Sequence, residues 1–232
     1  MTNLKKLISP GVVIPMLFFV VVIPFLPLLI SRHWDWWEAW VYGVLAVLGF
    51  AISRALAARR HPDLLAERAR FMRHENAESW DRVLAPLVGL GGGLIPLVAG
   101  LEALADGLPT FSLRVRVVSL IIILAGYALA SYALVENRFF SGMVRIQHDR
   151  GHQVVSSGPY RWMRHPGYAG ALLTYLATPI FLSSPWAYLP AVFVAIALVI
   201  RVRLEDETLQ DRLDGYRDYA SRVRYRLLPG VW

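Results

Sequence analysis

Two long apolar blocks without charge limit the folds open to this sequence. Residues 11–30 and 117–135 contain no charged side chain. Such runs match the roughly 20 residues that a helix needs to cross the hydrocarbon of a bilayer. The block at 11–30 is longer than the apolar core of a typical signal peptide, so we expect it to be retained as a transmembrane helix. The pattern predicts an integral membrane protein, and the 56% hydrophobic content agrees with it.

Six hydrophobic segments can be drawn along the chain: residues 10–30, 36–55, 83–105, 117–135, 168–182 and 186–200. Only Ser183, Ser184 and Pro185 separate the last two, which are short for spanning a bilayer. We predict an all-α polytopic membrane protein with five or six transmembrane helices, the last two forming a short helical hairpin. Residues 1–110 would supply the N-terminal helices and the loop 54–82, and residues 111–232 the functional core of a single integrated domain.

The basic residues indicate the orientation of these helices. With the N-terminus inside, 21 of the 24 Lys and Arg residues fall on the inner side, leaving Arg32, Arg114 and Arg116 outside. This asymmetry follows the positive-inside rule. We therefore predict that the N-terminus, the loops 54–82 and 136–166 and the C-terminal tail are cytoplasmic. The net charge of +7 then reports topology, and we expect no nucleic-acid partner.

Two stretches on this side have helical periodicity. Residues 63–73 resemble an amphipathic helix lying at the membrane surface. Residues 204–223 form a second predicted helix, with Leu209, Leu213 and Tyr216 on one face.

The loop before residue 168 concentrates polar and turn-forming residues. Gly158-Pro159 and His165-Pro166 punctuate it, and Pro166 stands where a first-turn proline begins a helix. The unpaired N–H groups of that helix start can receive an anionic ligand. We predict that the 136–166 loop and the C-terminal helix form a cytoplasmic cofactor site.

Other interpretations of this loop remain open. His148 and His152 could share a helix face as metal ligands, but no third ligand has suitable spacing and no cysteine is present, so no metal is expected. Arg164 and His165 could instead pair with acids of the tail in a structural role. The arginines of the loop could also contact lipid headgroups.

Arg201 and Glu205 follow the last apolar segment directly and are i,i+4 neighbours on a helix. Their spacing alone favours a snorkelling arginine beside a solvated acid. Membrane-edge charges are also candidates for function.

The same motifs resemble the isoprenylcysteine carboxyl methyltransferase family, which is related to phospholipid methyltransferases. The resemblance covers about residues 120–232 and rests on His152-Gln153-Val154, Gly158-Pro159-Tyr160, Arg164-His165-Pro166-Gly167-Tyr168, and Glu205-Asp206 followed by Leu209, Tyr216 and Tyr219.

The resemblance implies transfer of a methyl group from S-adenosylmethionine, leaving S-adenosylhomocysteine, to a lipophilic acceptor that enters from the bilayer. It implies carboxyl O-methylation of an isoprenylcysteine-like substrate, with a different lipid, thiol or amine acceptor, a nicotinamide-dependent membrane reductase or a non-catalytic lipid-binding protein as alternatives. The implied cofactor-binding residues are Gln147, His152, Gln153, Val154, Val155, Tyr160, His165, Pro166, Gly167, Tyr168 and Glu205. Arg201 and Glu205 are the implied catalytic residues, and Arg201 would bind the acceptor carboxylate.

Overall fold

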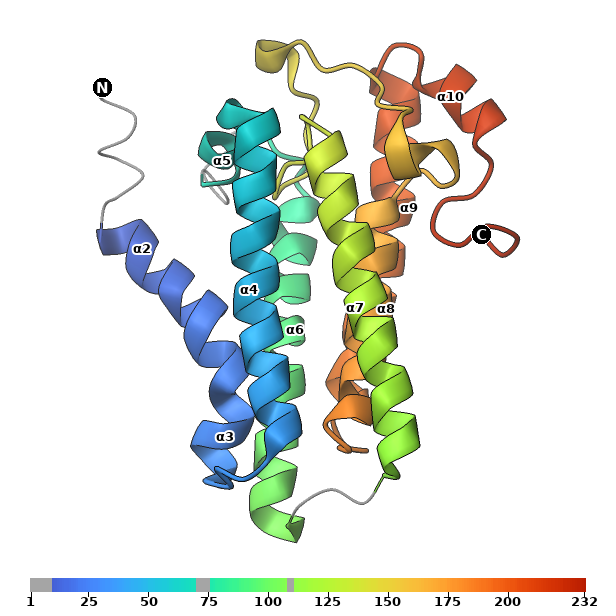
Figure 1. The fold of residues 1–232 in the computed structure, drawn as a ribbon. Coiled ribbons are helices and arrows are strands. Elements are labelled where there is room, and N and C mark those ends of the chain that lie inside the picture. The colour runs from blue at the N-terminus through green and yellow to red at the C-terminus, as the bar shows by residue number, and fades with distance from the viewer. Residues whose placement is uncertain (1–9, 70–75, 108–110) are drawn as a thin grey trace.

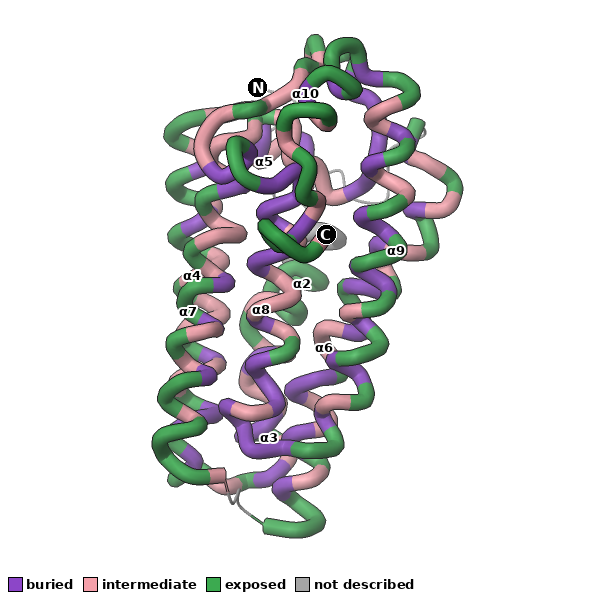
Figure 2. The backbone as a smooth tube through the Cα atoms, turned by 90° about the vertical axis from the view of Figure 1, so that its right-hand side faces the viewer, coloured by how far each residue is buried: buried purple, intermediate pink, exposed green. Residues whose placement is uncertain are grey.

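The computed structural model describes residues 10–69, 76–107 and 111–232, which form an all-helical bundle (Figure 1). Four helical stretches are long and apolar enough to cross a membrane: Ile14–Ser31, Trp37–Arg60, Asp81–Asp106 and Leu113–Glu136. Many leucine and isoleucine residues of these helices are exposed, among them Leu48, Leu90 and Ile121. Figure 2 shows exposed positions, in green, along the length of the bundle. The predicted polytopic membrane fold is therefore confirmed.

The first of these stretches is not a regular α-helix. It consists of α2 (Pro10–Leu17), a π-helical turn η1 (Phe18–Val22), a 3₁₀ turn η2 (Ile23–Phe25) and α3 (Leu26–Ser31). Pro24 and Pro27 lack the backbone N–H that a continuous α-helix would use, so the hydrogen-bond pattern changes around them. At its α2 end the segment leans away from the bundle (Figure 1). At its other end, α3 packs against α6.

Five further long helices complete the bundle: α4 (Trp37–Arg60), α6 (Asp81–Asp106), α7 (Leu113–Glu136), α8 (Pro166–Phe181) and α9 (Tyr188–Arg212). The 16 residues of α8 extend about 24 Å at 1.5 Å per residue, short of the roughly 30 Å hydrocarbon core. The expected short hairpin is present in α8 and the first half of α9.

The predicted boundary between the last apolar segment and a separate helix over residues 204–223 is wrong. Nothing between Ile200 and Arg212 breaks a helix, so α9 continues out of its apolar half into the polar end of the molecule. The chain turns only at Gly215, whose positive φ of 78° suits glycine, and α10 (Tyr216–Arg222) follows. The apolar pattern therefore ends where α9 passes from the apolar part of the bundle into its polar end, while the helix itself continues.

A glycine contact brings α7 and α8 unusually close together. A Cβ placed on Gly170 would lie 2.5 Å from the carbonyl oxygen of Gly126, and one on Gly126 would lie 2.6 Å from that of Gly170. Small residues permit such approach of membrane helices. Because α8 begins at the polar loop, this contact sets where the loop sits relative to α7.

The polar elements gather at one end of the bundle, where α5 (Pro62–Arg68), the loop after α7 and α10 lie in Figure 1. The predicted surface helix over 63–73 is described only in part, since residues 70–73 lie outside the described residues. In the described part, Leu64 is fully buried against Ala57 and Leu134. Its apolar face therefore packs on the protein.

Gly170→Ala should lower the thermal unfolding midpoint of the detergent-purified protein, because the new methyl group meets backbone atoms that cannot rotate away. Overpacking of this kind costs about 1–3 kcal/mol. Gly89→Ala is the matched control, since a Cβ there has nothing within 4 Å and alanine favours a helix. Equal midpoints for Gly170→Ala and the wild type would contradict the close approach.

Candidate functional site

The carboxylate of Asp206, on the polar half of α9, is fully buried and organises the end of the bundle. Arg164 donates to its two oxygens at 2.7 and 2.8 Å, and Arg226 donates at 2.9 Å. The hydroxyl of Tyr216 donates at 3.0 Å, and Nε2 of His165 lies 3.1 Å away. Burial alone would raise the pKa of Asp206, but these hydrogen bonds and charges outweigh it and hold the pKa far below its usual range. The structural interpretation of Arg164 and His165, pairing with a tail acid, is confirmed.

The C-terminal segment is held by the same loop. Nη1 of Arg164 donates to the carbonyls of Val223 and Arg224 at 2.7 and 2.9 Å. The backbone N–H of His165 donates to the carbonyl of Arg226 at 2.9 Å. The start of α8 is therefore fixed to α9 through side chains, and to the C-terminal segment through both side-chain and backbone hydrogen bonds.

Arg201 is buried and binds Asp81 of α6 with its guanidinium fork. Nε and Nη2 donate to the two carboxylate oxygens of Asp81 at 2.7 and 2.9 Å, and Nη2 also donates to the carbonyl of Gly142 at 2.9 Å. The expectation of a snorkelling side chain is wrong, because the charge turns into the protein. Nε and Nη2 of Arg201 are thus hydrogen-bonded within the protein. Nη1 has no hydrogen-bond acceptor among the described residues and can donate to another group.

Glu205 stands one helical turn after Arg201 and is half-buried. Its Oε2 accepts a 2.6 Å hydrogen bond from the hydroxyl of Tyr168, at the start of α8. Within the described residues Oε1 has no hydrogen-bond donor. One carboxylate oxygen is therefore positioned while the other stays open to the pocket.

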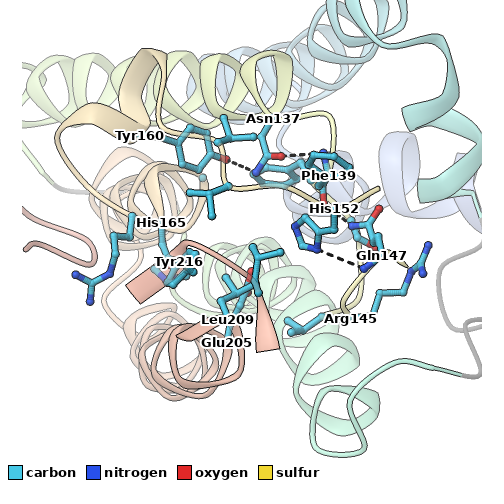
Figure 3. Close-up of a pocket in the computed structure, with 18 of the residues that line it drawn as sticks. Asn137, Phe139, Arg145, Gln147, His152, Tyr160, His165, Glu205, Leu209 and Tyr216 are labelled. Atoms are coloured by element: carbon cyan, nitrogen blue, oxygen red, sulfur yellow. Dashed lines mark hydrogen bonds between the residues drawn. The ribbon is translucent and has the colours of Figure 1, made fainter. Parts of the chain in front are cut away.

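Aromatic rings form the opposite wall of the site. The rings of Phe139 and His152 are in contact, with centroids 4.6 Å apart and planes tilted by 39°. Nδ1 of His152 accepts from the backbone N–H of Gln147 at 3.3 Å. Tyr160 is buried beside them and accepts a 3.2 Å hydrogen bond from Asn137. Figure 3 shows Tyr160 and Phe139 on one side and Glu205 with Leu209 on the other.

These walls line a pocket of about 770 Å³, its opening to solvent included. Eleven of the twelve residues predicted for the site line it: Gln147, His152, Gln153, Val154, Val155, Tyr160, His165, Gly167, Tyr168, Arg201 and Glu205. Pro166 does not, because it begins α8 behind them. The roles assigned to these residues stay predictions.

Two of the predicted site residues, Gln147 and His165, are hydrogen-bonded to other protein groups. The amide of Gln147 donates to the carbonyl of Phe139 at 2.7 Å and accepts from Arg150, so both of its polar atoms brace the loop. His165 is engaged by Asp206.

The remaining lining residues lie outside the predicted site: Asn137, Phe139, Phe140, Ser141, Met143, Val144, Arg145, Arg164, Leu209, Leu213, Tyr216 and Tyr219. Four of these, Arg164, Leu209, Tyr216 and Tyr219, belong to the family motifs, although no site role was predicted for them. The helical periodicity of residues 209–216 signalled three of them. Nothing in the local pattern marks residues 137–145, which reach the pocket because they connect α7 to the loop.

Two acidic residues of the short helix α5 bind arginines of the segment that follows α7. Glu67 binds buried Arg145 at 2.8 Å, and Arg145 also binds Asp149 at 2.7 Å. Asp63 accepts from Arg150 at 2.8 Å and from Arg138 at 3.1 Å. The N-terminal half of the chain therefore helps to shape a pocket whose motifs all lie in the C-terminal half.

No group of three His, Cys, Asp or Glu residues able to hold a metal ion occurs within the part of the chain that the structure describes. His148 and His152 accordingly lack a third ligand there.

Comparisons with known proteins agree with the motifs. Residues 118–211 match the isoprenylcysteine carboxyl methyltransferase (ICMT) family. A probable protein-S-isoprenylcysteine O-methyltransferase of Oryza sativa subsp. indica is 31% identical over 117 residues, which cover 47% of this chain and 59% of that protein. Protein-S-isoprenylcysteine O-methyltransferase A of Arabidopsis thaliana is 34% identical over 112 residues, covering 45% of this chain and 54% of that protein. The predicted family resemblance is confirmed.

A sterol enzyme is also similar over part of the chain. The Delta(14)-sterol reductase TM7SF2 of Mus musculus is 34% identical over 95 residues, covering 40% of this chain and 23% of the reductase. The chain spans little more than half the length of the methyltransferases it matches.

Asp206→Asn should destabilise the protein strongly, because it leaves Arg164 and Arg226 facing a neutral group in a buried network. Breaking such a network costs about 3–5 kcal/mol. The measurement is the unfolding midpoint in detergent. Asp211→Asn removes an acid on the exposed face of the same helix and should change stability by about 0.5 kcal/mol or less. Similar losses for both variants would contradict the central role of Asp206.

His152 should make stability depend on pH. Burial, with the nearby charges of Arg145 and Arg150, lowers its pKa to about 4, below the usual value of about 6.5. The unfolded chain then binds the proton more readily, so stability is complete above pH 6.5 and declines as the pH falls toward 4. His152→Phe should flatten the fall of the unfolding midpoint between pH 7 and 5.

His148→Phe, which removes an exposed imidazole four residues away, is the matched control for this measurement. Equal pH slopes for the wild type and His152→Phe would show that His152 does not titrate in this way.

Proposed function

We propose that this chain, whose residues 118–211 match the isoprenylcysteine carboxyl methyltransferase family, transfers a methyl group from S-adenosylmethionine to a lipophilic acceptor at the membrane. The specific reaction proposed is carboxyl O-methylation of an isoprenylcysteine-like substrate, as the names of the plant relatives suggest. The observation that carries the proposal is the convergence of eleven predicted site residues on one pocket at the polar end of an apolar bundle.

The donors and acceptors of the pocket fit this cofactor. The backbone N–H groups of Gln153, Val154 and Val155 have no hydrogen-bond partner among the described residues, although the segment lines the pocket. They can donate to a carboxylate or to ring nitrogens. Oε1 of Glu205 can accept from an ammonium or a ribose hydroxyl. The rings of Phe139 and His152, which contact each other at the pocket wall, can pack against adenine.

The protein's contribution to catalysis would be alignment. S-adenosylmethionine supplies an electrophilic methyl group, which a carboxylate oxygen can accept as the sulfur–methyl bond breaks, with its electron pair remaining on sulfur and no proton transferred. No general base is therefore needed, and holding the two reactants in line can supply effective concentrations above about 10⁵ M. Nη1 of Arg201 would orient the acceptor, while its other nitrogens stay on Asp81.

We also propose that the pocket faces the cytoplasm. The predicted cytoplasmic segments α5, the 136–166 loop and α10 lie together at one end of the bundle, as the charge asymmetry requires (Figure 1). Cofactor would then enter from water and acceptor from the bilayer.

A nicotinamide-dependent reduction is the second candidate, because the mouse sterol reductase is similar over 40% of the chain. The two reactions use different cofactors, so binding measurements distinguish them. Calorimetry on detergent-purified protein should detect S-adenosylhomocysteine binding and no binding of the reduced nicotinamide dinucleotide. Binding of the dinucleotide alone would favour the reductase.

Glu205→Gln should weaken S-adenosylhomocysteine binding at least about tenfold, because a charged acceptor contributes roughly 1.5–3 kcal/mol to a hydrogen bond. The measurement is the same calorimetric titration. Glu207→Gln, two residues further along α9 and paired on the surface with Arg203, is the matched control and should bind as the wild type does. Unchanged affinity in Glu205→Gln would remove Glu205 from the cofactor site.

A further inference from the structure

A separate cavity lies at the end of the bundle opposite the cofactor pocket, where α6 ends and the chain turns from α8 into α9 (Figure 1). Its volume is about 460 Å³, its opening to solvent included. No arginine, lysine or histidine is among the described residues that line it. Its polar side chains belong to Trp36, Glu102, Asp106, Ser183 and Ser184, and the proposed methyl transfer uses none of them.

Two buried side chains of this cavity have polar atoms without a partner. Trp36 is 2% exposed and Ser183 is 8% exposed. Neither the indole Nε1 of Trp36 nor the hydroxyl of Ser183 has a hydrogen-bond partner among the described residues. Trp36 packs in one apolar cluster with Ala103 and Leu182, so its ring is held in place. Because unpaired buried donors are unfavourable and rare in native proteins, these two atoms indicate a bound group with a hydrogen-bond acceptor.

Two carboxylates line the same cavity. Oε2 of Glu102 accepts from the hydroxyl of Ser184 and, at 3.1 Å, from the backbone N–H of Trp186, which fixes the chain just before α9. Oε1 of Glu102 has no donor in the described part of the chain, and the carboxylate of Asp106, one turn further along α6, is exposed. The C-terminal ends of α6 and α8 both lie here, and helix C-termini carry partial negative charge. The electrostatics of the cavity therefore favour a cation.

A bare metal ion does not suit both halves of this site. The indole N–H of Trp36 can only donate, so it would direct a positive hydrogen at the metal. A primary ammonium group can instead donate to Glu102 and Asp106, while an oxygen a few bonds away accepts from Trp36 and Ser183. The ligand that satisfies every group combines an ammonium with a nearby anionic oxygen, because charge-assisted hydrogen bonds are the strong ones.

Exposed tryptophans indicate that the cavity lies at the depth of lipid headgroups. Trp34 and Trp37 flank Trp36 in the chain, and Trp186 follows the lining residue Pro185. All three of these flanking indoles are exposed. Indole rings are enriched where the hydrocarbon of a bilayer meets its headgroups. A lipid head is therefore the source of the ammonium and the oxygen that this position favours.

We propose that this cavity binds the ethanolamine phosphate head of a phospholipid. Its ammonium group lies on Glu102 and Asp106, and a phosphate oxygen accepts from Trp36 and Ser183. The inference does not depend on the proposed function, because the cavity shares no lining residue with the cofactor pocket. The bound head connects the ends of α6 and α8 to the residue that precedes α4.

The test titrates dioleoyl phosphatidylethanolamine into the detergent-purified full chain and follows the lipid-bound mass by native mass spectrometry. We expect this lipid to bind at least about tenfold more tightly than phosphatidylcholine, whose methylated ammonium cannot donate a hydrogen bond. Phosphatidic acid, which lacks the ammonium group, should also bind at least about tenfold more weakly.

Glu102→Gln and Ser183→Gly should each weaken phosphatidylethanolamine binding at least about fivefold, because each removes one charged or donating group from the site. Ser183 has a φ of 50°, which glycine adopts more readily, so Ser183→Gly should not lower the unfolding midpoint measured without added lipid. This variant separates lost recognition from lost folding. Asp35→Asn, which removes an exposed acid beside Trp36 but outside the cavity, is the matched control and should bind as the wild type does.

Equal affinities for the ethanolamine lipid, phosphatidylcholine and phosphatidic acid would overturn the inference and leave water as the partner of Trp36 and Ser183. Unchanged binding in both Glu102→Gln and Ser183→Gly would overturn it as well, since the lipid would then bind elsewhere. Binding of glycerophosphoethanolamine as tight as that of the intact lipid would rule out a membrane source and identify a soluble amine instead.

Discussion

The polar end of this membrane bundle depends on the buried carboxylate of Asp206. A charge removed from water is stable only when its oxygens are fully hydrogen-bonded, and five side chains from the loop, α9, α10 and the C-terminal segment provide this. The same bonds hold the loop against α9. Glu205 precedes Asp206 on α9, so the bonds that hold α9 against the loop also fix Glu205 at the pocket wall.

Arg201 and Asp81 make a second buried connection, between α9 and α6. The guanidinium that the family resemblance assigns to the acceptor is therefore already stabilised by the protein. A partly neutralised arginine can position an acceptor carboxylate without holding it so tightly that it loses nucleophilicity.

One close contact and one ring shape the surroundings of the polar pocket. Gly126 and Gly170 let α7 and α8 approach. Gly167 makes room for the ring of Phe140, which lines both the polar pocket and an apolar cavity between η1, α4, α7 and α8. The whole arrangement is built within a helical bundle, without a separate nucleotide-binding domain among the described residues.

The sequence by itself determined the membrane class, the hairpin and nearly all motif residues of the pocket, because apolar runs and turn-forming pairs are local patterns that act within one or two helical turns. It also placed the loop and Glu205 on the same side through the distribution of charge. Only the tertiary structure decided that α9 runs unbroken into the polar end, that Asp206 is the centre of the network, and that Arg201 turns inward to Asp81. Those outcomes depend on partners 41 to 120 residues away in the chain, as the pairs of Asp206 with His165 and Arg201 with Asp81 show. No local pattern specifies which buried charge meets which partner, since that is settled when the helices pack and each buried ion must find its counter-ion.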